Sequence, residues 1–193
     1  MDRKTQLLDS AENLVRRRGF DGMSFADVAQ ANDIKTASIH YHFPGKAVLG
    51  VELMKRYSTT LGDEMQALIE SDLTARQKLE RVITRYRTAL NGGKTMCLCV
   101  AMSVSRDNLT APIVAEMRSF RTMMLGWLTK LYQQAEEDKT LLVTTDLATQ
   151  AAATLALLEG AQLIAHTEND PTKFDAPAQM LISDPHSQKD AKQ

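Results

Sequence analysis

The sequence predicts an all-α protein of about nine helices: three short helices, a long connecting helix and a bundle of roughly five more. Three observations support this fold class. Apolar residues recur at the three- and four-residue spacing of an amphipathic helix along almost the whole chain. No segment alternates between apolar and polar residues as a half-buried strand would. Capping residues precede several of the periodic segments, and glycine, proline or asparagine follows them.

The first two helices have clear boundaries. Leu7, Ala11 and Val15 lie on one face of the first helix, and Gly19 follows it as a C-terminal glycine. Ser24 is a good N-cap for the second helix.

The next two helices differ in length. The dipeptide Asn32-Asp33 ends the second helix after barely two turns. A short third helix over about Thr36–Tyr41 ends before Pro44, because residues that precede proline leave the helical region. A long helix then runs from Lys46 towards Asp72.

The second half of the chain predicts longer helices. Thr74 and Gln77 form a capping box, and the helix that they begin ends at 91–93, Asn-Gly-Gly. A helical segment follows around Cys97–Ser105, and Pro112 opens the next long helix.

The last helices are bounded by threonines and prolines. Thr144 or Thr145 is expected to start a long helix that reaches His166. Pro177 and Pro185 confine the final helix to roughly 178–183.

Composition excludes several classes of protein. The chain has 193 residues, 44% hydrophobic and 24% charged, which is typical of a globular domain. The net charge of −1 excludes a protein that binds nucleic acid through a uniformly basic surface. It does not exclude a locally basic face, because residues 1–57 hold nine Lys and Arg against seven Asp and Glu. The longest apolar stretches are too short to span a bilayer, and the N-terminus is not a signal peptide, so we expect a cytoplasmic protein without a membrane partner.

The segment Ser24–Lys46 has the organisation of a helix-turn-helix. Its apolar residues are spaced to form a small core: Phe25, Val28, Ala29, Ile34 and Ile39. The second of its helices places these residues on the outward or leading side: Lys35, Thr36, Ala37, Ser38, His40, Tyr41 and His42. Small residues allow such a helix to approach a major groove closely, and polar residues reach base edges and phosphates. Lys46 begins the next helix, where a cation and free N–H groups favour a phosphate.

This segment resembles the recognition-helix signature of TetR-family transcriptional regulators. The resemblance is carried by Ile34–Phe43, followed by Gly45-Lys46 and Leu49. His40 stands where the family usually has tyrosine, and Lys35 replaces a frequent small N-cap residue. The specific likeness covers about residues 5–55.

The resemblance implies that the chain has two domains with different functions. Residues 1–47 would form the DNA-binding domain, and residues 48–193 would form a helical domain for ligand binding and dimerisation. Late in the chain, 158–161, Leu-Glu-Gly-Ala, is similar to a sequence often seen in the family's dimer helix.

The C-terminal bundle contains residues suited to an apolar ligand pocket. Ten methionines are many for this length, and thioethers adapt to irregular ligands. Trp127 adds a large apolar wall with one N–H donor. The candidate ligand-binding residues are Tyr86, Met96, Met102, Met117, Phe120, Met124, Trp127 and Leu158. The helical spacing of these residues is equally expected of an ordinary hydrophobic core that binds no ligand.

The two cysteines, Cys97 and Cys99, have two interpretations. A Cys-x-Cys pair can sense electrophiles or oxidants, but buried inert thiols fit the apolar surroundings better. No further cysteine or histidine completes a metal site, and no catalytic motif is present. We therefore expect neither a metal or cofactor nor an enzyme.

The last long helix carries a broad stripe of apolar and small residues. Its members are Leu147, Ala151, Thr154, Leu155, Leu158, Ala161, Gln162 and Ala165. Little chain remains to cover this stripe within one monomer, so we expect it to pack against the same helix of a second copy.

Together these observations predict a homodimeric repressor that binds a palindromic duplex operator and is released by an unidentified small-molecule inducer. Two alternatives keep the same DNA-binding head. One is a repressor that senses redox state or electrophiles through cysteine, and the other is a DNA-organising factor without an inducer.

Overall fold

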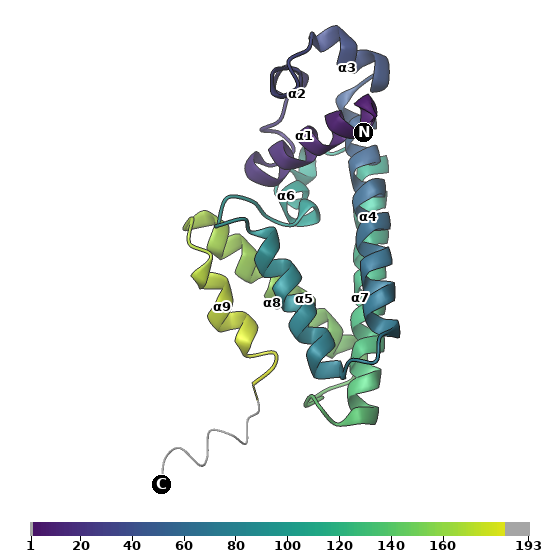
Figure 1. Cartoon of the computed structure of the whole chain (residues 1–193), viewed down its shortest axis with the longest axis vertical. Coiled ribbons are helices and arrows are strands. Elements are labelled where there is room, and N and C mark those ends of the chain that lie inside the picture. The colour runs from purple at the N-terminus through teal and green to yellow at the C-terminus, as the bar shows by residue number, and fades with distance from the viewer. Residues whose placement is uncertain (1, 184–193) are drawn as a thin grey trace. The chain divides into compact units, whose positions relative to one another are not determined.

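The computed structural model describes residues 2–183, and over that range its regular elements are all helices, which confirms the predicted fold class (Figure 1). The described elements are α1 (Arg3–Arg18), α2 (Phe25–Ala31), α3 (Thr36–His42), α4 (Lys46–Glu70), α5 (Ala75–Ala89), α6 (Leu98–Ser103), the 3₁₀ turn η1 (Arg106–Asn108), α7 (Ala111–Asp138), α8 (Leu147–Thr167) and α9 (Thr172–Gln179).

The helices group into two compact units. The head unit comprises Met1–Leu61 and Thr95–Arg121, and the body unit comprises Gly62–Lys94 and Thr122–Gln193. The long helices α4 and α7 each contribute to both. The head unit thus includes α6, η1 and the first part of α7 besides the first three helices. A functional boundary at residue 47 stays a prediction.

Gly19 and Ser24 bound the first two helices as the sequence predicts, and Asp2 adds an N-cap that was not predicted. The carboxylate of Asp2 accepts a hydrogen bond from the Lys4 amide at 2.7 Å, and α1 ends at Gly19 with a φ of 75°. Ser24 caps α2, and Asp27 completes a capping box. These caps satisfy N–H groups that the first turn of a helix leaves without partners.

The core of the helix-turn-helix is smaller than predicted. Val28, Ala29 and Ile39 are buried, but Phe25 and Ile34 are only half-buried. Phe43 is fully buried and takes a place in this core.

The start of α8 differs from the prediction. Asp146 is the N-cap, rather than Thr144 or Thr145, and it accepts a hydrogen bond from the Thr149 amide at 3.0 Å. Thr144 instead donates to the Gln150 side chain. Several residues that can cap stand next to one another here, and only the backbone direction selects among them.

The predicted bounds of the final helix are wrong. The helix runs over Thr172–Gln179 and contains Pro177, which we expected to precede it. Asp170 accepts from the Thr172 amide at 2.9 Å, and fully buried Phe174 anchors the first turn. Pro177 removes one backbone donor near the end of a short helix, where the loss disrupts little. Pro185 lies outside the described residues.

The predicted dimer stripe on α8 is also wrong, because the body unit covers it. From Ala151 to Ala165 its members are buried against neighbours that include α5 and α9. Thr154 and Tyr132 place their hydroxyls 2.6 Å apart, and Gln162 donates to the Tyr86 carbonyl at 2.7 Å. Helices α5, α7 and α9 contact the stripe. The prediction considered only the short chain that follows α8, and it missed the two helices that precede α8.

By length and composition, α8 is the one described helix that could cross a membrane. The criterion is weak for a helix that packs within a helical body. Two of its polar side chains, Thr154 and Gln162, are fully buried and hydrogen-bonded to other helices of the body unit.

Candidate DNA-binding surface

The recognition helix α3 is attached to the head by one face. Ile39 is fully buried, and the chain leaves the helix at fully buried Phe43. Successive residues of a helix are rotated by about 100°, so Ala37 and Tyr41 lie opposite Ile39. They form an outward ridge, with Ser38 and His40 on its two sides.

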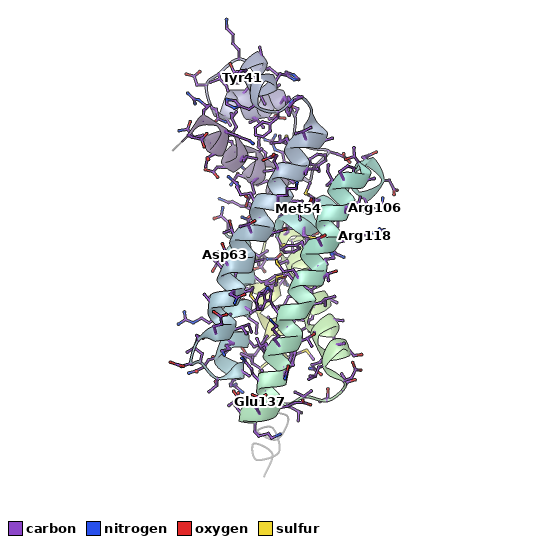
Figure 2. All side chains as sticks on the ribbon, turned by 90° about the vertical axis from the view of Figure 1, so that its right-hand side faces the viewer. Tyr41, Met54, Asp63, Arg106, Arg118 and Glu137 are labelled. Atoms are coloured by element: carbon purple, nitrogen blue, oxygen red, sulfur yellow. The ribbon has the colours of Figure 1, made fainter. Side chains whose placement is uncertain are left out.

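Exposure agrees with this geometry. The candidate contact residues Lys35, Thr36, Ala37, Ser38, His40 and Tyr41 are all exposed, while His42 and Lys46 are half-buried. Tyr41 is 86% exposed, which is unusual for an aromatic side chain (Figure 2). The ring of Tyr41 is therefore accessible to a partner that approaches this face of α3.

The turn between α2 and α3 is built without glycine. Asp33 adopts a φ of 51°, a left-handed conformation that aspartate tolerates better than most residues. The Ile34 amide donates to the Ala29 carbonyl at 3.1 Å, and the Asn32 side chain donates to the Val28 carbonyl at 2.8 Å. These bonds fix the angle at which α3 leaves α2.

Aromatic contacts orient Tyr41 of the ridge and His40 beside it. The rings of Tyr41 and His42 meet edge to face with centroids 5.2 Å apart. His40 packs in the same manner against Phe25 of α2, at 4.9 Å. Its imidazole is therefore held against the helix pair, and this residue type differs from the tyrosine usual in the family.

Lys46 is held at the first turn of α4. Its ammonium lies 4.8 Å from the centroid of the Phe20 ring and 3.5 Å from the Asp21 carbonyl oxygen. The first turn of α4 contains no acidic residue. The charge is thus placed beside backbone N–H groups that attract an anion.

The basic end of α1 has mixed roles. Arg16 donates to the Met96 carbonyl at 2.7 Å, and Arg18 lies 3.4 Å from Asp27. Hydrogen bonds from Ser24 and the nearby Arg18 lower the pKa of Asp27, so its carboxylate stays charged. Arg17 is exposed and remains available to a phosphate.

A contact that the sequence did not predict joins the loop between α1 and α2 to η1 and its N-cap Ser105. The Asp21 amide donates to the Ser105 hydroxyl at 3.4 Å, and Asn108 donates to the Asp21 carboxylate at 2.8 Å. About 85 residues separate these partners, and neither side has a local motif that would have indicated the contact.

The candidate ligand residues are divided between the two units. In the head unit Met96, Met102, Met117 and Phe120 are buried, and in the body unit Tyr86, Met124 and Leu158 are buried. Trp127 is half-buried, and its indole N–H is buried with no hydrogen-bond partner among residues 2–183. An unsatisfied buried donor is costly and is the feature that a ligand acceptor would relieve.

Both cysteines are buried in the head unit. Cys97 is the N-cap of α6, and its sulfur lies 3.3 Å from the Tyr57 hydroxyl. Cys99 is fully buried. Within the described part of the chain, no group of three His, Cys, Asp or Glu side chains is placed to hold a metal ion.

Comparisons with known proteins agree with this geometry. Residues 7–53 match the model of bacterial regulatory proteins of the tetR family. The chain is 24% identical over 167 residues to the HTH-type transcriptional repressor NemR of Escherichia coli, which covers 84% of this chain and 83% of NemR.

Solved structures extend the likeness to the whole fold. A TetR transcriptional regulator from Legionella pneumophila is 26% identical, with a TM-score of 0.85 over 94% of this chain and 96% of that one. A TetR-family regulator from Agrobacterium tumefaciens is 24% identical, with a TM-score of 0.87 over 93% and 95%. The match of residues 7–53 identifies a DNA-binding domain of the tetR family of bacterial regulatory proteins at the N-terminus of this chain, and the solved structures show that the chain shares the fold of such regulators.

Proposed function

We propose that the protein is a repressor that binds a palindromic operator as a homodimer and is released by a small-molecule inducer. The observation that carries the DNA-binding part is the exposed ridge of Ala37 and Tyr41 on α3. A transcriptional regulator acts on the chromosome, so we place its site of action in the cytoplasm.

Each half-site would be read by the same set of side chains. Ala37 at the centre of the ridge permits close approach to the floor of the major groove, and Ser38 and His40 reach towards base edges beside it. The phosphate contacts fall to the flanking residues Lys35, Thr36, Tyr41, His42 and Lys46.

The surface proposed for dimerisation is the face of α8 opposite its buried stripe. Small exposed residues, including Ala156 and Gly160, lie along it, and Leu163 and Ile164 are exposed beside them. On α9, Met180 at the C-cap is 73% exposed. Small residues allow close helix packing, and the exposed large apolar side chains supply area to bury, which supports a two-fold pairing of body units.

The proposed inducer site lies in the body unit and uses its candidate ligand residues Tyr86, Met124 and Leu158, with Trp127 as the hydrogen-bond donor. The unpartnered indole N–H supports this role, since an acceptor on the ligand would satisfy it. The transcriptional regulator FadR of Bacillus subtilis, which shares this fold, has been solved in complex with stearoyl-CoA, a ligand with a long apolar acyl chain. A ligand that favours one orientation of α4 by about 1–3 kcal/mol would suffice for induction.

The test begins with an unbiased selection of duplexes by the purified protein. Enrichment of a palindrome with half-sites about one helical turn apart is the expected result. The absence of any preferred duplex at modest salt would refute the proposal. Many scattered genomic sites without a ligand-reversible footprint would favour the DNA-organising alternative.

The inducer is then sought with the single tryptophan as reporter. A compound that both changes Trp127 fluorescence and releases the operator is expected among small apolar molecules. Trp127→Phe should weaken its effect on operator release, whereas an undiminished effect would remove Trp127 from the site.

A second candidate is release by oxidation or electrophiles. The Tyr57 hydroxyl close to Cys97 favours it, because a hydrogen bond to sulfur stabilises a thiolate. Burial of both thiols opposes it, since a reagent must first open the head unit. Replacing both Cys97 and Cys99 by serine decides the matter: a response to electrophiles that persists excludes this candidate.

A further inference from the structure

The head unit has an open groove whose lining includes no residue of the recognition helix and none of the candidate ligand residues. It has a volume of about 300 Å³ and is lined by Arg106, Leu109, Ala111, Val114, Ala115 and Arg118. Arg106 belongs to η1, and Arg118 lies two turns into α7 (Figure 2). The volume is at the lower end of the range for small-molecule sites.

The two arginines of the groove lack carboxylate partners. Both are exposed, and neither forms an ion pair with any residue of the described chain. Two other cations of the head unit are paired by contrast: Lys55 with Glu116, and Arg56 with acidic residues of α1. Asp107 is adjacent to Arg106 in sequence but does not line the groove.

The local backbone adds to the positive potential. The first turn of α7 contains no acidic residue, so the partial positive charge of the helix N-terminus is not offset there. The groove therefore combines the guanidinium groups of Arg106 and Arg118 with the N-terminal end of α7, and all three attract an anion.

The remaining wall of the groove is apolar. Ala111, Val114, Ala115 and Arg118 follow the three- and four-residue spacing that places side chains on one face of α7. Val114 is half-buried, and Leu109 of the adjoining segment is 8% exposed. Such a wall suits a short hydrocarbon chain and offers little to a strongly hydrated ligand.

From these features we infer a second small-molecule site, for an amphipathic anion whose carboxylate or phosphate head is held by Arg106 and Arg118. Guanidinium groups bind both heads through paired hydrogen bonds. The hydrocarbon portion lies on Val114 and Leu109. This site is independent of the operator and of the inducer proposed above.

The test is calorimetric titration of the full chain with octanoate and octyl phosphate, with octanol and octylamine as uncharged and cationic controls. We expect saturable binding of at least one anion and none of either control. The anion that binds more tightly identifies the preferred head group.

Variants then locate the binding. Arg118→Gln and Arg106→Gln should each weaken anion binding by about tenfold or more, because each removes a charged donor pair. Both residues are exposed, so circular dichroism should show unchanged folding. Arg81→Gln is the matched control, since Arg81 lines a groove of about 350 Å³ on α5 that also contains the carboxylate of Glu80.

Two outcomes would overturn the inference. One is the absence of saturable binding by either anion. The other is binding that Arg118→Gln and Arg106→Gln leave unchanged, which would assign the anion to the bundle interior or to another surface.

Discussion

Replacing Tyr41 by alanine separates the function of the recognition helix from its stability. The ring is 86% exposed, and its one ring contact is with neighbouring His42. Removing it should change the free energy of unfolding by no more than about 0.5 kcal/mol, as for other surface substitutions.

The effect on operator affinity should be much larger. A lost hydrogen bond to a charged phosphate costs about 1.5–3 kcal/mol, and separate contacts add approximately. A two-fold dimer carries the substitution twice, so the loss should be about 3–6 kcal/mol, or at least roughly 150-fold in the dissociation constant.

The assay is fluorescence anisotropy with the selected duplex, alongside thermal unfolding of each variant. Tyr41→Phe distinguishes the hydroxyl from the ring: retained affinity assigns the contact to the ring. Ile39→Ala is the opposite control, because that side chain is fully buried and its truncation should cost about 2–5 kcal/mol of stability. Operator affinity of Tyr41→Ala equal to that of the unmodified protein would refute the assignment of the ridge.

Four further predictions test other parts of the structure. Lys46→Ala should weaken operator binding and flatten its dependence on salt by about one unit of slope per half-site; an unchanged slope in a salt titration argues against a phosphate contact. Leu163→Glu with Ile164→Glu should yield monomers in light scattering, because charges would be buried in the proposed interface; an intact dimer would assign it elsewhere. Arg56→Met removes ion pairs of 2.7 and 2.8 Å between α4 and α1, and should lower the unfolding free energy by about 1 kcal/mol in urea titration; no loss at low salt contradicts this. The hydrogen bond from the Thr149 amide lowers the pKa of the Asp146 carboxyl from its ordinary 3.8. The cap therefore stabilises the fold above pH 3.8, and this stabilisation disappears as the pH falls through the lower pKa of the folded state. Asp146→Asn should reduce the dependence of the unfolding free energy on acid in urea titrations, and an unchanged profile would contradict the cap.

Local signals predicted the fold well because capping and helix periodicity act over only a few residues. Ser24 and the Thr74–Gln77 box begin helices as expected, and Gly19 ends α1. The recognition helix follows from the same logic, since one buried residue, Ile39, fixes which side chains face outward.

Long-range packing could not be predicted in the same way. The stripe on α8 has the periodicity of a buried face, but periodicity does not identify which helix covers it. The contact between Asp21 and Asn108 joins distant segments without a motif on either side. The expectation that Pro177 would precede the final helix failed because proline is tolerated near the end of a short helix, and α9 instead begins upstream, where Phe174 is buried.

The hydrogen bonds that join Asp21, in the loop between α1 and α2, to Ser105 and Asn108 bear on how this regulator is re-engineered. A hybrid that grafts residues 1–47 onto another regulator would separate Asp21 and Arg16 from the partners that hold them. A hybrid that exchanges both stretches of the head unit together, Met1–Leu61 and Thr95–Arg121, would keep these contacts.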